Sequence, residues 1–126
     1  ALGNRHAGVM GDDAAVASYL DAAASAGEPA WQLPLPEHMR EDLQSPVADL
    51  QNAQIGVSAG GSLFAGLFLQ EFVGRTSDEA DAPRIPWVHL DIAGVGMNKG
   101  AGFGYTAKGV TGATVRSLIT LLAKHA

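Results

Sequence analysis

Apolar residues recur at helical spacing near the start of the chain, on a single face: Val16, Tyr19, Leu20 and Ala23. This spacing predicts a helix over residues 14–26. Asp12 and Asp13 precede it, and their carboxylates can accept hydrogen bonds from the free N–H groups of the first turn. Gly27 suits the left-handed residue that commonly follows a helix. Before the helix, the apolar pair at 9–10 favours a strand.

Proline and glycine divide the middle of the chain into three further segments. Residues 28–36 hold three prolines, each of which pushes the preceding residue into an extended conformation, so this segment is expected to be extended. Residues 37–44 predict a short helix that begins after Pro36 and stops at Ser45-Pro46. Residues 63–73, which follow two glycines, are apolar around nearly the whole circumference, which predicts a helix buried on most sides.

The last third of the chain predicts a strand, a long loop and a final helix. Residues 85–92 form a near-continuous apolar run, typical of a strand covered on both faces. Residues 93–112 hold seven glycines and predict a long loop, which in a compact domain is usually functional or mobile. Residues 113–124 predict an amphipathic helix with four apolar positions on one face: Val115, Leu118, Ile119 and Leu122.

Together these elements indicate an α/β fold. One strong strand and one weak strand cannot make an independent sheet, so we expect the elements to form the edge of a larger sandwich whose other strands lie elsewhere. The chain opens Ala1-Leu2-Gly3, with neither an initiator Met nor a signal-peptide pattern. We therefore expect it to be a piece of a longer polypeptide.

Composition narrows the possible functions. The 126 residues include no cysteine, which removes disulfides, thiol nucleophiles and cysteine-ligated metal sites. The net charge is −5 and the eight Lys and Arg are scattered, which disfavours binding to nucleic acid phosphates. The longest apolar run, residues 63–69, is far shorter than the roughly 20 residues that a membrane span needs. We expect neither a nucleic-acid partner nor a membrane span.

Two local patterns invite a chemical interpretation. His89 and Asp91 lie two apart on the expected strand, so both project to one face, as a metal site or an acid–base pair requires. The alternative is a polar strand end whose side chains satisfy loop backbone groups. The glycines in 58–62, before a helix, could bind an anion or simply allow close packing, and the Lys-Ser/Thr of a Walker motif is missing.

Two weaker patterns add little. The G-x-G-x-G spacing of residues 100–104 does not lead into a helix as a dinucleotide-binding turn does. The acidic residues at 78–81 lack the glycine turn and the later bidentate acid of a calcium loop, so they fit a solvated loop better. From the residues alone, no catalytic constellation emerges.

Five blocks follow one another along the chain: 31–36 (WQLPLP), 45–52 (SPVADLQN), 60–72 (GGS leading to FLQEF), 87–94 (WVHLDIAG) and 108–112 (KGVTG). In this order they resemble the C-terminal part of the leucyl aminopeptidase (cytosol aminopeptidase) family, across essentially the whole chain. The resemblance implies part of a three-layer α/β/α sandwich with a mixed sheet, as in the zinc exopeptidases. Residues 1–126 would be the C-terminal portion of a peptidase catalytic domain.

The resemblance also implies an activity. In this family two divalent ions, Mn, Zn or Mg, activate a water that attacks the N-terminal peptide bond of a peptide. The family's motif Asn-Thr-Asp-Ala-Glu-Gly-Arg is absent from the chain. By resemblance, the metal ligands and an N-terminal domain lie upstream of Ala1, and neither a catalytic nor a metal-binding residue is expected in this chain. The family further implies a cytoplasmic homohexamer, with the rest of the catalytic domain as a partner of this segment.

What the resemblance transfers to individual residues is a substrate pocket. Ala93 matches the position that lines the pocket for the substrate's N-terminal side chain, and Gly94 to Gly96 continue that wall. Ile55 is a further pocket candidate. We therefore expect the C-terminal segment of a two-metal aminopeptidase that supplies substrate pocket and packing. The alternative is a non-catalytic scaffold, or a degenerate homologue that lost the metal centre.

Overall fold

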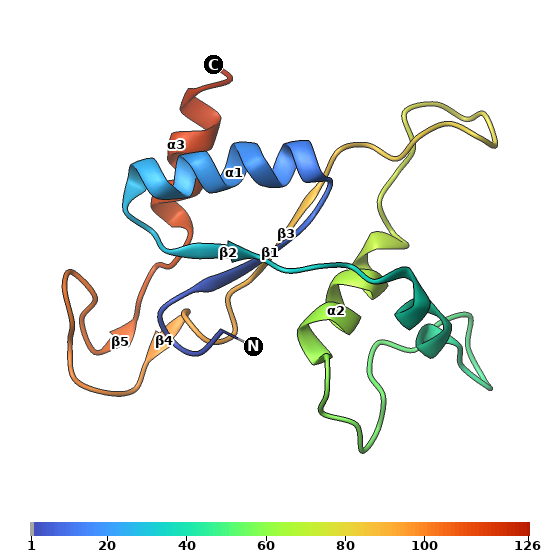
Figure 1. Cartoon of the computed structure of the whole chain (residues 1–126), viewed down its shortest axis with the longest axis horizontal. Helices are drawn as coiled ribbons and strands as arrows, with labels where there is room; N and C mark the ends of the chain where they lie inside the picture. The colour runs from blue at the N-terminus through green and yellow to red at the C-terminus, as the bar shows by residue number, and fades with distance from the viewer. Residues whose placement is uncertain (1) are drawn as a thin grey trace.

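The computed structural model describes residues 2–126 (Figure 1). In chain order the elements are β1 (Ala7–Gly11), α1 (Asp13–Ala26), β2 (Ala30–Gln32), the 3₁₀ helix η1 (Glu37–Leu43), α2 (Gly61–Gln70), β3 (Val88–Asp91), β4 (Met97–Asn98), β5 (Gly109–Val110) and α3 (Val115–Ala123). Helices α1 and α3 lie together at one end, and α2 and η1 lie at the other (Figure 1). Over the described range, no helix has the length and apolar character to cross a membrane.

Three strands form a mixed sheet in which β1 lies between β2 and β3. β1 is parallel to β2, with Val9 opposite Gln32, and antiparallel to β3, with Val9 opposite Leu90. Parallel neighbours need a crossover connection, and α1 provides it. The predicted α/β class with a mixed sheet is confirmed, and the strands expected at 9–10 and within 85–92 are neighbours in that sheet.

The two faces of β1 meet different helices. Val9 is fully buried in a cluster with Val16 and Tyr19 of α1. Met10 projects to the opposite face, since neighbouring strand side chains alternate. Its sulfur lies 3.0 Å from where a Cβ on Gly66 of α2 would stand. A glycine at this position therefore lets α2 pack closely on the sheet.

Local capping sets both ends of α1, as predicted. The side chain of Asp12 accepts a hydrogen bond from the N–H of Ala15 at 3.0 Å. Gly27 follows the helix with φ +68°, a left-handed conformation that costs glycine little. The helix begins at Asp13, one residue earlier than the pattern predicts.

Helix α2 packs on η1 through a second, smaller core that contains Leu43, Phe64 and Leu67. The prediction that this helix is buried on most sides holds for most of its residues: between Gly61 and Gln70 all but Gly61 and Leu69 are buried or half-buried. Leu69 and, beyond the helix, Phe72 are 42% and 67% exposed. The described chain has too few elements to cover the remaining apolar circumference. The helix also ends at Gln70 rather than 73, where the chain continues in turns.

Strand β3 is shorter than the predicted 85–92 and lies at an edge of the described sheet. Pro86 has no N–H to donate to a ladder, and Ile85 donates instead to the carbonyl of Gly74 at 2.9 Å. All four residues of β3 are half-buried, so this chain does not cover the strand fully on both faces. The loop predicted over 93–112 contains a small hairpin, in which Met97 of β4 lies opposite Val110 of β5.

Helix α3 faces α1 with its less apolar side. Ser117 is fully buried, whereas the predicted apolar stripe is 40–68% exposed: Val115, Leu118, Ile119 and Leu122. Amphipathic helices ordinarily bury such a stripe. Here Leu121 and the polar contacts at the α3 N-terminus face the rest of the described chain, whereas the stripe is left exposed. The helix begins at Val115, two residues later than predicted, because Thr114 has φ +72°.

Candidate functional site

The segment 93–96, which follows β3, is a tight turn held by its own backbone. The N–H groups of Val95 and Gly96 both donate to the carbonyl of Ile92, at 3.1 and 2.8 Å. Ala93 and Gly94 are exposed at this turn, whereas Val95 is buried. The turn therefore presents two small residues outward and anchors itself with a larger one. We call residues 93–96 the wall segment.

Gly94 is required by a close approach of two backbone segments. A Cβ at this position would collide with the carbonyl oxygen of Gly3. Any side chain here would displace the N-terminal segment or the wall segment. The glycine thus has a packing reason that is independent of any ligand.

Asp91 ties the end of β3 to the start of α2. The hydroxyl of Ser62 holds the pKa of the Asp91 carboxyl below the ordinary value, against the raising effect of burial. The N–H of Ala93, 3.1 Å from Asp91 Oδ1, and the nearby His89 also lower this pKa. The carboxylate therefore stays charged and accepts a backbone N–H of the following loop. This agrees with the simpler explanation of His89 and Asp91, a polar strand end that satisfies loop backbone groups.

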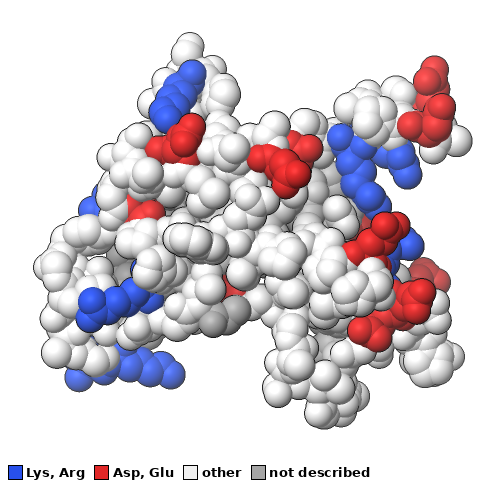
Figure 2. Space-filling view, viewed as in Figure 1, with Lys and Arg blue, Asp and Glu red and all other residues white. Residues whose placement is uncertain are grey.

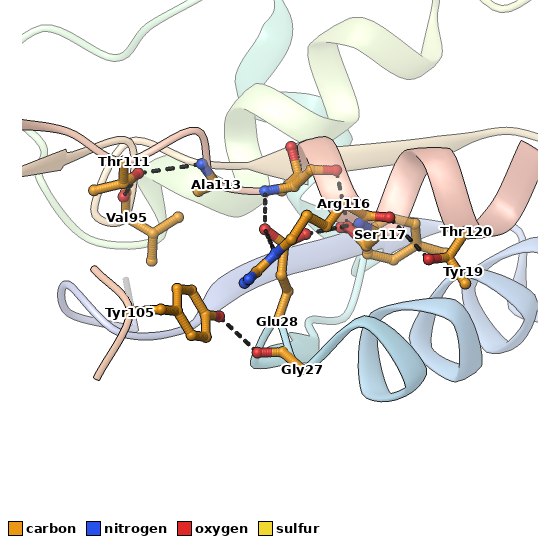
Figure 3. Close-up of polar contacts among 11 residues, drawn as sticks. Tyr19, Gly27, Glu28, Val95, Tyr105, Thr111, Ala113, Arg116, Ser117 and Thr120 are labelled. Atoms are coloured by element: carbon orange, nitrogen blue, oxygen red, sulfur yellow. Dashed lines mark hydrogen bonds and ion pairs between the residues drawn. The ribbon is translucent and has the colours of Figure 1, made fainter. Parts of the chain in front are cut away.

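The wall segment is bound to the loop before α3 by Thr111. Its hydroxyl donates to the carbonyl of Val95 at 2.5 Å, and its N–H donates to the carbonyl of Gly96 at 3.2 Å. The same hydroxyl oxygen accepts a hydrogen bond from the N–H of Ala113 at 3.2 Å. One residue thus links two consecutive carbonyls of the wall to the chain that enters α3. Figure 3 shows its contacts with Val95 and Ala113.

Glu28 caps helix α3 from a distant part of the sequence. Its carboxylate accepts hydrogen bonds from the N–H groups of Thr114, at 3.2 Å, and Ser117, at 2.8 Å (Figure 3). Nε of Arg116 lies 3.7 Å from the same carboxylate, and its guanidinium lies 3.7 Å from the centre of the Tyr105 ring. The acid meets the free donors and the positive end of the helix dipole, so it fixes the start of α3.

Buried hydroxyls complete this contact between α1 and α3. The Tyr19 hydroxyl lies 2.8 Å from the Ser117 hydroxyl, and burial raises the pKa of Tyr19 despite that hydrogen bond. Ser117 in turn donates to the carbonyl of Thr114 at 2.9 Å. Beside them lies a cavity of about 380 Å³, whose lining includes Glu28, Val95 and Thr111. The cavity is adjacent to the wall segment but is not lined by Ala93 or Gly94.

The other predicted sites are placed as follows. Ile55 is fully exposed in the loop between η1 and α2, and no described cavity brings it together with Ala93. Its pocket role stays a prediction. In the 58–62 segment, Gly60 has φ +68°, a left-handed conformation that side chains rarely adopt, so the backbone accounts for this glycine. Asn98, which donates to the carbonyls of Ala101 and Ala107, orders the 100–104 loop.

Charged groups do not gather into one stripe. On the face shown in Figure 2, Lys and Arg occur in separate groups, and the acidic side chains likewise lie at several places. The acidic residues at 78–81 are all exposed, as expected for a solvated loop. Among residues 2–126, no three His, Asp or Glu side chains are grouped as a metal site requires.

Glu28 and Thr111 are absent from the residues that sequence reasoning selects. The N–H groups that Glu28 binds lie 86 and 89 positions away in the sequence. The carbonyl that the Thr111 hydroxyl binds lies 16 positions away. The position of Thr111 within the 108–112 block is the one signal that singles it out.

Comparisons with known proteins agree on one family. The model of the cytosol aminopeptidase family, catalytic domain, matches residues 1–119. The probable cytosol aminopeptidase of Clavibacter michiganensis is 59% identical over 123 residues, which are 98% of this chain and 24% of that protein. That of Leifsonia xyli is 51% identical over 121 residues, which are 96% of this chain and 24% of that protein. The chain thus spans about a quarter of the length of these relatives.

A solved structure gives the same result. The bottromycin maturation enzyme BotP in complex with Mn matches with a TM-score of 0.85 and 37% identity, over 99% of this chain and 26% of that one. Together with the mixed sheet, this match defines the class of protein, a mixed α/β fold like that of BotP. Within that class, the chain belongs to the cytosol aminopeptidase family.

Proposed function

We propose that this chain is the C-terminal segment of the catalytic domain of a two-metal leucyl aminopeptidase, which removes N-terminal residues from peptides. In this proposal the wall segment lies against the side chain of the substrate's N-terminal residue. Ala93 and Gly94 make the contact, and Ile55 adds a further one. The segment supplies the pocket and the packing, and the reaction takes place on groups outside residues 2–126.

The observation that carries this proposal is the exposed, small-residue turn at the end of β3. Ala93 and Gly94 are exposed, while backbone hydrogen bonds to Ile92 and the buried Val95 hold the turn in place. Two small residues leave room for a leucine-sized group. Because one methylene in an apolar pocket changes specificity by only about 1–3 kcal/mol, the proposed enzyme accepts several N-terminal residues.

Two divalent metal ions, Mn, Zn or Mg, belong to the proposal for the whole enzyme, where they would polarise the scissile carbonyl and activate water. The donor set on this chain does not fit such a centre. Over the described range no three His, Asp or Glu side chains are grouped as metal ligands. The Asp91 carboxylate already interacts with Ser62 and accepts the N–H of Ala93. We assign no metal ligand to residues 2–126.

The surroundings of the segment form part of the same proposal. The exposed apolar stripe of α3 and the exposed Leu69 and Phe72 beside α2 are contact surface for the rest of the catalytic domain. With that part present, the sheet would become the middle of a three-layer α/β/α sandwich. The complete protein would act on peptides as a cytoplasmic homohexamer.

A chimera tests the proposal. This chain replaces the matching 123-residue segment of the Clavibacter relative, and release of leucine from Leu-p-nitroanilide is measured with added Mn²⁺. We expect the chimera to be active and the isolated chain to be inactive. The substitution Ala93→Leu in the chimera should lower kcat/KM for Leu-p-nitroanilide about tenfold or more relative to Ala-p-nitroanilide, because the added side chain fills the pocket.

The matched control is Ala17→Leu, which adds the same side chain at an exposed position of α1. Its substrate preference should equal that of the parent chimera. An inactive but folded chimera would favour the non-catalytic scaffold, and turnover by the isolated chain would show that the reactive groups are on it. An unchanged preference in Ala93→Leu would remove Ala93 from the pocket.

A further inference from the structure

We propose that Thr111 is a positioning residue that sets the place of the wall segment. This role rests on the proposed function, and Thr111 itself touches no substrate. Val95 is the one buried residue of the wall segment, whereas Ala93 and Gly94 are exposed, so side-chain packing holds only part of residues 93–96 in place.

Thr111 holds two consecutive carbonyls of the wall. Its hydroxyl donates to Val95 at 2.5 Å, and its N–H donates to Gly96 at 3.2 Å. The N–H groups of Val95 and Gly96 donate to Ile92 and that of Ala93 donates to Asp91, all within the turn after β3. The two contacts with Thr111 instead join the wall to another part of the chain. Both reach across from the loop before α3, which makes them the link between the turn and the helix.

The loop that carries Thr111 is itself anchored. Its hydroxyl oxygen accepts the N–H of Ala113, which closes the turn before α3. Thr114 then adopts φ +72°, unusual for a β-branched residue, and Glu28 holds its N–H and that of Ser117. The hydrogen bonds of Thr111 therefore fix the wall segment relative to the capped start of α3.

The hydroxyl is the group on which this role depends. Valine has nearly the shape of threonine but can neither donate to the carbonyl of Val95 nor accept from the N–H of Ala113. Serine keeps both contacts. A wall that touches the substrate's side chain contributes equally to ground-state and transition-state binding, so loosening it raises KM and leaves kcat nearly unchanged.

The first test uses the chimera described above with Thr111→Val and Thr111→Ser. For Leu-p-nitroanilide, we expect Thr111→Val to raise KM about three- to tenfold, the range expected for the loss of the one hydrogen bond that the hydroxyl makes directly to the wall segment. The change for Ala-p-nitroanilide should be smaller, because a methyl group reaches less of the wall. Thr111→Ser should retain the parent KM, and kcat should stay within about twofold throughout.

The matched control is Thr120→Val, which also removes a side-chain hydrogen bond to a backbone carbonyl, that of Arg116 at 2.9 Å within α3. It should leave KM unchanged. An equal fall of kcat for both substrates in Thr111→Val, with KM unchanged, would show a loss of folded enzyme and overturn the positioning role. A serine variant as impaired as the valine variant would also overturn it.

A second test needs no activity. Amide hydrogen exchange is measured by NMR on the 126-residue chain, at the N–H groups of Val95 and Gly96. Thr111→Val should speed exchange at these two amides about two- to tenfold, relative to amides in α1, and Thr111→Ser should not. Unchanged exchange overturns the inference. Faster exchange together with an inactive parent chimera supports the positioning of 93–96 and places the failure in the proposed function.

Discussion

Replacing Glu28 by glutamine removes the charge that caps α3 and keeps the size of the side chain. In the structure the side chain of Glu28 is only 11% exposed, and each of its two oxygens accepts one backbone N–H. In Glu28→Gln one of those acceptors becomes an NH₂ group. That group faces a backbone N–H, with which it cannot form a hydrogen bond.

The expected loss of stability follows from these contacts. A hydrogen bond to a charged acceptor contributes about 1.5–3 kcal/mol, and a helix N-cap contributes about 0.5–2 kcal/mol. The two values describe overlapping contacts and are not summed. The weak ion pair with Arg116, at 3.7 Å and half-exposed on the arginine side, adds little. We expect the free energy of unfolding to fall by about 2 kcal/mol.

Urea unfolding followed by circular dichroism measures this loss. With a slope of about 2 kcal/mol per molar urea, the midpoint should fall by about 1 M. The control is Glu79→Gln, the same substitution in the exposed acidic loop, which should shift the midpoint by less than about 0.2 M. A Glu28→Gln midpoint within about 0.3 M of the parent would refute the view that this carboxylate fixes α3.

Two further predictions concern the pKa shifts. Tyr19→Phe removes the buried hydrogen bond to Ser117 and should cost about 1 kcal/mol near neutral pH. The raised pKa of Tyr19 keeps it protonated in the folded state, so the parent should lose stability above about pH 10, and thermal unfolding of Tyr19→Phe should show less of that loss. The pKa of Asp91 is lowered below its ordinary value of 3.8 by the Ser62 hydroxyl, so its contribution exists above that pH and is lost as pH falls through the folded-state pKa. Urea midpoints between pH 5 and 2 should fall less steeply in Asp91→Asn than in the parent or in the exposed Asp78→Asn control, and equal slopes would contradict the shift.

Several elements could be predicted because their causes lie within a few residues. The N-cap of Asp12 on Ala15, the left-handed Gly27 and the apolar spacing between them determine α1. Proline spacing likewise accounts for the extended segment that contains β2. The ordered motif blocks indicated the family, because they cover nearly the whole chain.

Predictions were wrong where the length or the burial of an element depends on which other parts of the chain lie beside it. The strand expected over 85–92 shortened to Val88–Asp91, since Pro86 cannot join a ladder and Ile85 pairs elsewhere. Helix α2 is apolar all round and mostly buried or half-buried, but it leaves Leu69 exposed, and the stripe of α3 is exposed. Periodicity identifies an apolar face; it does not say whether a partner element lies opposite that face.

The sequence by itself therefore determined the α/β class, the position of most elements, the family and the small residues at 93–94. Only the tertiary structure decided the orientation of α3, the cap by Glu28 and the hold of Thr111 on the wall segment. The physical reason is range: helix caps and turns form between residues three or four apart, whereas Glu28 reaches N–H groups 86 and 89 positions away. Such contacts exist only once α3 has packed against α1.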